Sequence, residues 1–335
     1  MNVRRTDRLR RLGLWTVLAV VVTVLAIASP TFRDPYNLSN ILEQNAAIGI
    51  VACGMAVMMI SGGFDLSVGA TGATASVVGA AVASAGGKDV WVVVAGLGIG
   101  LLIGLVNGFL IAKIGINPFV TTFAMASIVS GLLFVATTAH SIMGSTPAVK
   151  AAAADKVGGV PIIFIIFIGF LTLVWFILNR TKYGHYVYSV GGNAEASHLS
   201  GVPVERVQIF AFAFGGVLTA SAGILLLGQT GIGQPSAAAS WPLDAIAICV
   251  VGGVALTGGV GRILDVLAAA LLLGVIANGL NQVNVSPYWQ PAVTGVVILG
   301  AVILDQLNRK RRTATCPERA SQTIHRVREE PVSAS

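Results

Sequence analysis

Long runs of apolar residues, separated by short polar stretches, make up almost the whole chain. Ten runs approach the ~20 residues that a helix needs to cross the ~30 Å hydrocarbon core of a bilayer. None shows the apolar–polar alternation of a membrane β-strand. The pattern predicts an all-α polytopic membrane protein with about ten transmembrane helices. The expected segments are residues 13–29, 41–61, 65–86, 90–112, 118–139, 160–178, 207–228, 243–258, 263–281 and 289–305.

The composition agrees with this pattern and excludes a soluble enzyme. Of the 335 residues, 55% are hydrophobic and 10% are charged. A soluble domain carries roughly 25% charged residues, and so small a charged fraction would not keep the surface of a globule hydrated. Glycine reaches 40 residues, or about 12% against a usual ~7%. Small residues allow the close backbone approach that drives helix association in lipid.

The net charge of +7 could indicate a nucleic-acid partner, but the positions of the charges indicate a membrane topology instead. Seventeen of the 21 Lys and Arg residues fall in loops on one side of the ten-segment arrangement. The other four are Arg33, Lys88, Lys150 and Lys156. Because basic loops stay inside, we expect both chain termini to lie in the cytoplasm.

The first apolar segment has a second interpretation as a cleavable signal peptide. Basic residues lie within 4–11, an apolar run covers 14–28, and Ala26-Ile27-Ala28 resembles a cleavage site. Its removal would leave nine segments and break the charge alternation, which favours a membrane helix. We therefore expect a basic cytoplasmic N-terminus at 1–12, a transmembrane domain at 13–305 and a disordered cytoplasmic tail at 306–335.

Similar residues recur in the same order in the two halves of the chain. Segments two to five begin on the outer side and segments seven to ten on the inner side, which predicts an inverted repeat with a pathway between the halves. The matched pairs are Asp65 with Asp244, Asn107-Gly108 with Asn278-Gly279, and Pro118-Phe119 with Pro287-Tyr288.

Polar residues inside the apolar segments are the candidates for a transport pathway. Ionisable groups there cost about 2.5–3.5 kcal/mol each at the bilayer centre. Asp65 and Asp244 either cap helix N-termini or line the pathway. The four histidines all fall in loops or the tail, which argues against a proton relay. The pathway or gating candidates are Asp65, Ser67, Asn107, Asn117, Thr121, Asp244, Asn278 and Asn281.

No catalytic or metal-binding motif occurs in the sequence. H-E-x-x-H, G-x-S-x-G and paired Cys/His spacings are all missing, and the three cysteines read as packing residues. The stretch Gly86-Gly87-Lys88-Asp89 lacks the upstream glycine and the hydroxyl residue of a phosphate-binding loop. We therefore expect no enzyme activity, no metal and no cofactor in this chain, and any ATP must be hydrolysed by another subunit.

The longest internal cytoplasmic loop, residues 179–206, contains a short helix with clear boundaries. Asn193 is a favourable N-cap, Glu195 suits the first turn, Gly201 can adopt a left-handed conformation, and Pro203 stops continuation. Residues 194–200 form two turns, too few for a helix that is stable alone in water. Such a helix needs a surface, either on its own bundle or on a partner.

At this loop the sequence resembles the permeases of ribose-type ABC importers. The similar stretches include YGHYVYSVGGNAEASHLSGVPVERV at 183–207, GGFDLSVG at 62–69, LDAIAICVVGGVALTGGVGRI at 243–263 and NGLNQVNVSPYWQ at 278–290. VNGFLIAKIGINPFVTTFAMASIVSGL at 106–132 and AVILDQLNRKRR at 301–312 also fit. Departures from the family pattern occur at Val260 and at Asp265-Val266, at the cytoplasmic mouth.

The resemblance implies a multi-pass permease of the bacterial inner membrane that moves a monosaccharide. It implies three kinds of partner: a second permease copy or a paralogue, an extracytoplasmic sugar-binding protein, and an ABC ATPase subunit that holds Mg-ATP. It also implies that the loop helix couples the ATPase to the bundle. The coupling residues are then Tyr186, Gly191, Gly192, Asn193, Glu195, Ala196, Leu199 and Gly201.

Two other transport functions stay open at this level. One is a branched-chain amino-acid type of ABC permease, and the other is a secondary transporter driven by an ion gradient. The small number of charges inside the segments argues against an ion-driven mechanism. The sequence does not identify the sugar.

Overall fold

The computed structural model describes residues 3–282 and the isolated positions 286, 289, 292, 295, 296, 299 and 300. Within these residues the chain is mostly helical, and its two-residue strands form two small antiparallel pairs, one of them between distant parts of the chain. The helices are α1 (Val3–Ala28), η1 (Thr31–Arg33), α2 (Pro35–Ile60), α3 (Val68–Ser84), α4 (Asp89–Ala112), α5 (Pro118–Thr137), α6 (Pro147–Ala154), α7 (Ile162–Arg180), α8 (Lys182–Gly192), α9 (Ala194–Leu199), α10 (Val204–Thr230), α11 (Trp241–Val251) and α12 (Ile263–Gln282). The strands are β1 (Ile142–Met143), β2 (Lys156–Val157), β3 (Val160–Pro161) and β4 (Ile232–Gly233).

Six of these helices are long and apolar enough to cross a membrane: α2, α4, α5, α7, α10 and α12. The apolar part of α1 (13–28), α3 and α11 are shorter. Nine of the ten predicted segments thus overlap helices, one of them only in part, while most of the tenth (289–305) and the tail lie outside the described residues. The structure therefore confirms an all-α polytopic membrane protein.

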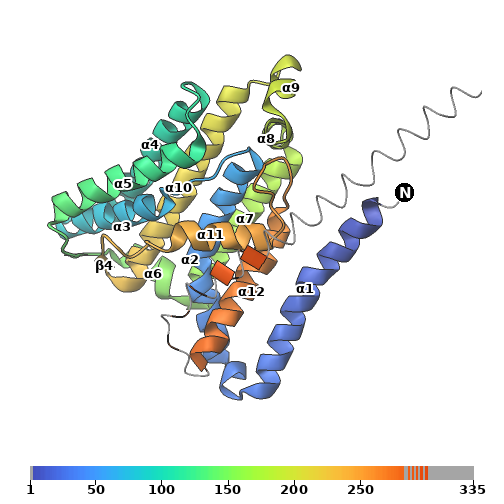
Figure 1. The fold of residues 1–335 in the computed structure, drawn as a ribbon. Coiled ribbons are helices and arrows are strands. Elements are labelled where there is room, and N and C mark those ends of the chain that lie inside the picture. Colours follow the sequence, from blue (N-terminus) through green and yellow to red (C-terminus); the bar gives the residue numbers. More distant parts are fainter. Residues whose placement is uncertain are drawn as a thin grey trace, which may run out of the picture.

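Helices α2 and α10 lie at the centre of the bundle and are its most buried spans (Figure 1). α10 packs on α4, α3 and α2, and α2 packs on α12, α7 and α11. α10, the first helix of the predicted second half, thus contacts α4 and α3, the third and second helices of the first half. In the same way, α2 contacts α12 and α11 of the second half. α2 and α10 also contact each other, at Gly54 and Gly215.

Glycines allow the central helices to approach with backbone against backbone. A Cβ on Gly100 of α4 would stand 2.3 Å from the carbonyl oxygen of Gly216 on α10. One turn further on, a Cβ on Gly104 would stand 2.4 Å from the carbonyl oxygen of Phe212. Real Cβ atoms do not approach so closely, so α4 and α10 require glycine at these positions. The high glycine content of the sequence is thus used for packing.

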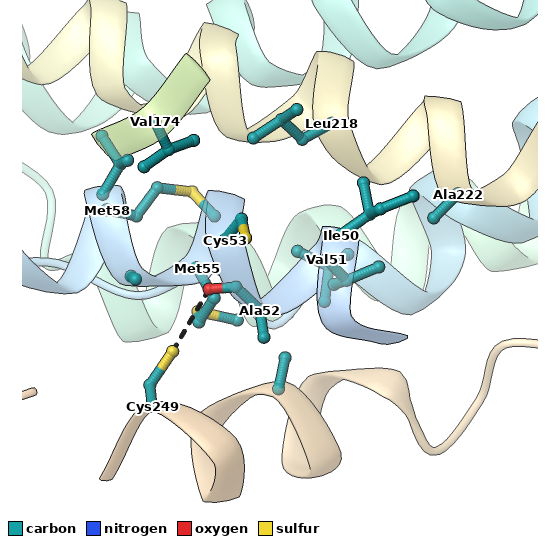
Figure 2. Packing of buried hydrophobic residues seen from close by; sticks show 14 of the residues in the cluster. Ile50, Val51, Ala52, Cys53, Met55, Met58, Val174, Leu218, Ala222 and Cys249 are labelled. Carbon is teal, nitrogen blue, oxygen red and sulfur yellow. Dashed lines mark hydrogen bonds between the residues drawn. The ribbon is translucent and has the colours of Figure 1, made fainter. Parts of the chain in front are cut away.

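Apolar side chains fill the space between α2 and its neighbours. Figure 2 shows Ile50, Met55 and Met58 of α2 packed among side chains of α7, α10 and α11. The thiol of Cys249 on α11 donates to the carbonyl oxygen of Ala52 at 3.4 Å. Both described cysteines are buried, in agreement with the prediction that they are packing residues.

The bundle has two ends, which we name by the short helices that they carry. At the α9 end, Lys113 after α4 forms an ion pair with Glu205 at the start of α10. At the α6 end, the side chain of Asp89 accepts from the backbone N–H of Ala148, 3.2 Å away. Figure 1 shows α8 and α9 at one end of the molecule and α6 at the other. Among the described loops, those after α4 and before α10 thus lie at one end, and those before α4 and at α6 lie at the other.

The second half departs from the predicted pattern at α11. The expected segment ran from 243 to 258, but the helix ends at Val251, after 11 residues. At 1.5 Å per residue it is about 16 Å long, roughly half of the hydrocarbon core. Gly252, Gly253, Gly258 and Gly259 follow it, and three of them have positive φ angles of 72–85°. These glycines end the helix and form an irregular connection to α12.

Candidate translocation and coupling sites

Three of the predicted pathway residues form one buried polar network. Asp65 Oδ1 accepts from the backbone N–H of Ser67 at 2.7 Å and from its hydroxyl at 2.6 Å. The side-chain amide of Asn107 on α4 donates to Asp65 Oδ2 at 3.3 Å and to Ser67 Oγ at 2.9 Å. Asp65 is 2% exposed, and the other two side chains are fully buried. The network joins the connection between α2 and α3 to α4.

A fourth residue of this network was not predicted from the sequence. The hydroxyl of Thr122 on α5 accepts from the backbone N–H of Leu66 at 3.1 Å, and Thr122 is fully buried. The same hydroxyl donates to the carbonyl oxygen of Pro118 at 2.8 Å. Residues 64–67 are thereby attached to α4 and α5 together. The motif that contains Thr122 was noted in the sequence, but a threonine in an apolar helix carries no signal of a tertiary contact.

Capping explains some of the other candidates. Asn117 is exposed and is the N-cap of α5, where its side chain accepts from the N–H of Phe119 at 2.9 Å. The hydroxyl of the nearby Thr121 donates to the carbonyl oxygen of Asn117 at 3.1 Å. Asp244 lies in the first turn of α11. Asp65, by contrast, precedes the N-cap of α3, which is Ser67.

The asparagines of α12 lie at the α6 end, apart from Asp65. Asn278 exchanges two amide hydrogen bonds with Asn37 of α2. Asn281 is exposed one turn further along α12. Although Asn107 and Asn278 were matched in the predicted repeat, Asn107 bonds within its own half and Asn278 bonds to the other half. The candidate pathway residues therefore do not form a single cluster.

The predicted short helix exists as α9, and a second helix precedes it. Asn193 is the N-cap of α9 and accepts from the N–H of Ala196 at 2.9 Å. Gly201 adopts the expected positive φ angle, 82°. The loop before α9, not predicted as helical, forms α8, where Tyr186 packs against the core. The tyrosines and glycines of this stretch have low helix propensity, so tertiary packing decides its structure.

Most of α9 faces away from the bundle. Its one buried residue is Ser197, whose hydroxyl lies 2.8 Å from that of Ser189 on α8 and holds α9 against α8. Glu195 and Ala196 are exposed, and Leu199 is 82% exposed. An apolar side chain at the tip of a projecting two-turn helix is available to a partner.

The end of α8 is joined to the bundle at a contact of three backbone segments, which we call the glycine junction. It consists of Ile60, Gly191, Gly258 and Gly259. The N–H of Gly259 donates to the carbonyl oxygen of Ile60 at 2.9 Å. A Cβ on Gly191 would stand 1.8 Å from that oxygen and 2.6 Å from that nitrogen. Gly191 therefore packs directly over a hydrogen bond that links α2 to the α11–α12 connection.

A tyrosine of α8 adds a second link at the same place. The hydroxyl of Tyr188 donates to the carbonyl oxygen of Gly261 at 2.9 Å. Burial raises the pKa of Tyr188, and the nearby charge of Arg262 lowers it by less, so the phenol stays protonated and can donate. The sequence did not predict a functional role for Tyr188, Gly258 or Gly259. Tyr188 lies far from the two glycines along the chain, so their proximity is visible only in the folded protein.

These features define a multi-pass helical membrane protein with an exposed helical extension at one end. The pattern of the family described as "Branched-chain amino acid transport system / permease component" matches residues 37–302. The chain belongs to this permease family. Within the part of the chain that the structure describes, His, Cys, Asp and Glu form no group of three that could hold a metal ion.

Curated relatives resemble the chain over nearly its full length. The ribose import permease protein RbsC of Bacillus subtilis is 36% identical over 300 residues, which cover 89% of this chain and 93% of that protein. The L-arabinose transport system permease protein AraH of Escherichia coli is 38% identical over 301 residues, with coverages of 90% and 92%. RbsC of Escherichia coli is 37% identical over 299 residues, with coverages of 88% and 92%. No solved structure matches the chain.

Proposed function

We propose that this chain is the permease subunit of an ATP-driven importer of a monosaccharide, in the inner membrane of a bacterium. The observation that carries the proposal is the similarity to ribose and L-arabinose permeases over about nine-tenths of both chains. The described part of the bundle contains six helices that can span a membrane and few charges among them, which suits a neutral polar solute. ATP hydrolysis is then supplied by a separate subunit.

The description of the matched family supports a second candidate, a branched-chain amino acid, because its words name that substrate. The relatives described above transport sugars by name, which favours the first candidate. Both candidates share the same architecture and partners, so the substrate must be measured.

The experiment reconstitutes the full chain in proteoliposomes with candidate ABC ATPase and binding-protein partners from the same bacterium. Radiolabelled ribose, L-arabinose and leucine are offered in parallel, with and without internal ATP. We expect ATP-dependent accumulation of one of the two sugars and none of leucine. Accumulation by the permease alone, driven by a sodium or proton gradient, would contradict the proposal, and accumulation of leucine would support the second candidate.

We further propose that α8 and α9 receive the ATPase, with Leu199 and Glu195 at the contact. The exposure of Leu199 and Glu195 supports this assignment. A cysteine at position 199, in a chain whose Cys316 is replaced by serine, reports the contact and the membrane side together. We expect an impermeant maleimide to label it only from the cytoplasmic side, and bound ATPase to slow the labelling at least tenfold.

Variants test the same contact by function. We expect Glu195→Arg combined with Gly201→Val to abolish ATP-dependent uptake while the chain is still inserted, because both the charge and the left-handed turn are lost. Normal transport by this double variant would contradict the docking role. Lys88→Ala, an exposed position before α4 at the α6 end of the bundle, is the control.

We also propose the inverted repeat and the ten-helix arrangement. The packing of α10 on α3 and α4, and of α2 on α11 and α12, supports a two-fold relation between the halves. Two copies of such a permease would enclose the route, as a homodimer or with a paralogue. A cysteine placed in residues 306–335 should be labelled from the same side as position 199, because ten spans return the chain to the cytoplasm.

A further inference from the structure

Between β4 and α11 the chain runs as an irregular polar segment along the outside of α3. We call residues 234–240, with the sequence Gln-Pro-Ser-Ala-Ala-Ala-Ser, the polar segment. Its backbone forms single turns, from the N–H of Ala237 to the carbonyl oxygen of Gln234 and from the N–H of Ala239 to that of Ser236. No helix or strand occurs in these seven residues.

Contacts with α3 place this segment inside the thickness of the bundle. Directly before the segment, Gly233 at the end of β4 packs against Val77, in the half of α3 towards the α6 end. Further on, the carbonyl oxygen of Ala238 lies 2.6 Å from where a Cβ on Gly69 would stand. Gly69 and Val77 are eight positions apart on α3, about 12 Å at 1.5 Å per residue. The chain therefore re-enters from the α6 end and descends along α3 to the level at which α11 begins.

One side of the segment is buried and the other is open. Pro235 and Ala238 are buried, and Ala238 packs against α3. Gln234, Ser236 and Ser240 are exposed, and the side-chain amide of Gln234 donates to the hydroxyl of Ser236 at 3.3 Å. The open side thus presents an amide and two hydroxyls, with the partly exposed carboxyl of Asp244 one turn beyond Ser240. These groups both donate and accept hydrogen bonds.

The open side of the polar segment does not suit contact with lipid. Irregular backbone that faces acyl chains at membrane depth does not occur, because its polar groups would lose their hydrogen bonds to water. It is tolerated only where other protein buries it or where it lines a water-filled cavity. The exposed faces of α4 and α5 are different: Leu102, Leu105, Phe123 and Ile128 are apolar and suit lipid.

We propose that the open side of the polar segment, with Gln234, Ser236 and Ser240, lines the water-filled route of the transported solute. The inference rests on the proposed function, since a monosaccharide bears hydroxyls that exchange hydrogen bonds with amides and hydroxyls. Short half-helices that meet irregular backbone near the midplane are where transporters place their solute sites. α11 is such a short helix, and the polar segment leads into its N-terminus.

Accessibility of introduced thiols tests the environment of the segment without any assumption about the solute. Single cysteines replace Ser236 and Ala239 in a chain with Cys316→Ser, since Cys53 and Cys249 are fully buried. The matched controls are Leu102→Cys and Ile128→Cys, in the middle of α4 and α5. We expect a cationic methanethiosulfonate, which does not enter hydrocarbon, to modify positions 236 and 239 at least tenfold faster than the controls.

Two results would overturn the assignment. Modification as slow as at positions 102 and 128 would show that water does not reach the segment. Slow modification together with a spontaneous disulfide between two copies through position 236 would show that a second copy covers it. Both outcomes can be read even if neither sugar is transported, so they are distinct from a failure of the proposed function.

Transport by two matched Ala→Phe variants then tests the route itself. Ala239 lies on the open side of the segment, and Ala124 is exposed on α5. We expect Ala239→Phe to lower ribose or L-arabinose uptake at least tenfold and Ala124→Phe to stay within twofold of the unmodified chain. Equal uptake by the two variants would contradict the route. Gln234→Leu, which keeps the size but removes the amide, should raise KM several-fold.

Discussion

Asn37 and Asn278 pair their side-chain amides, each donating to the other's oxygen. The two N–O distances are 3.1 and 2.9 Å, and the pair fastens the beginning of α2 to the end of α12. Asn37 also donates to the carbonyl oxygen of Phe32, 3.2 Å away. Near the pair, Ser29 and Thr31 donate to the side chain of Gln282. At the α6 end of the bundle, side-chain hydrogen bonds thus hold the α1–α2 connection and the start of α2 against the end of α12.

The two asparagines should stabilise the protein as a unit. Within a membrane bundle an interhelical hydrogen bond contributes about 0.6 kcal/mol on average. We expect the double-mutant cycle of Asn37→Ala and Asn278→Ala to give a coupling free energy of about 0.5–1.5 kcal/mol in unfolding. Unfolding in mixed detergent micelles with increasing dodecyl sulfate measures it. Strict additivity of the two single variants would contradict the pair.

The network around Asp65 should tolerate an amide but not an apolar side chain. Asp65→Ala leaves the N–H and hydroxyl of Ser67 without their acceptor, and the amide of Asn107 keeps only its bond to Ser67 Oγ. We expect a loss of at least about 2 kcal/mol in the free energy of unfolding, since each buried unsatisfied group costs about 1–3 kcal/mol. Asn107 Oδ1 has no hydrogen-bond partner among the described residues. It can accept from a new amide if the Asn107 side chain flips, so Asp65→Asn should cost under about 1 kcal/mol.

A variant of Asn107 separates the effect of the lost hydrogen bond from the effect of charge in the same network. Asn107→Asp brings a second carboxylate against Asp65 and removes the donor between them. We expect it to destabilise the protein more than Asn107→Ala does, because like charges repel strongly in a buried site. The same micelle unfolding experiment compares the two variants. Equal stability of the two would show that one of the two carboxyls is protonated, so that the charges do not repel.

Helix positions could be predicted from the sequence because the bilayer sets the length of an apolar run. For α4, the segment expected at 90–112 differs from Asp89–Ala112 by one residue. For α11, the same reasoning failed. The apolar residues 252–258 read as a continuation, but their glycines turn the backbone instead. Hydropathy reports that a stretch is buried, and it does not distinguish a helix from a compact glycine-rich turn.

The site residues were predictable where the signal was local. The cap at Asn193 and the left-handed Gly201 follow from their neighbours in the chain. Asp65 and Asn107 were identified one by one as polar residues in apolar surroundings, but their contact spans 42 positions. The glycine junction was hidden for the same reason, since Ile60, Gly191 and Gly259 meet only in the folded bundle. Tertiary contacts of this kind require the structure.

Glycines 98 and 100 of α4 form a matched pair for testing the helix contact. A Cβ at position 100 would collide with the backbone of Gly216, whereas a Cβ at position 98 meets nothing within 4 Å. We expect Gly100→Ala to destabilise the protein by about 1–3 kcal/mol through overpacking. Gly98→Ala should leave stability unchanged or raise it by up to about 1 kcal/mol, since alanine favours the helix. Thermal unfolding in detergent ranks the two, and the reverse order would contradict the backbone contact.

The glycine junction should transmit movement from α8 and α9 into the bundle. Neither Gly191 nor Gly192 has a positive φ angle, so alanine fits the backbone at both. At position 191 its methyl group displaces the hydrogen bond between Gly259 and Ile60, whereas at position 192 it meets nothing within 4 Å. We expect Gly191→Ala to lower the sugar imported per ATP hydrolysed at least tenfold while the ATPase still binds. Gly192→Ala should change this ratio less than twofold.

Tyr188→Phe tests the same transmission with a smaller disturbance of the fold. The ring stays in place, and only the hydrogen bond to the carbonyl oxygen of Gly261 is lost. We expect the ratio of sugar imported to ATP hydrolysed to fall about threefold, with the amount of bound ATPase unchanged. Tyr183→Phe is the control, since Tyr183 is exposed on α8 and contacts the ring of Phe210. A normal ratio in both Gly191→Ala and Tyr188→Phe would show that movement enters the bundle elsewhere, for example through the packing of α8 on α7 and α10.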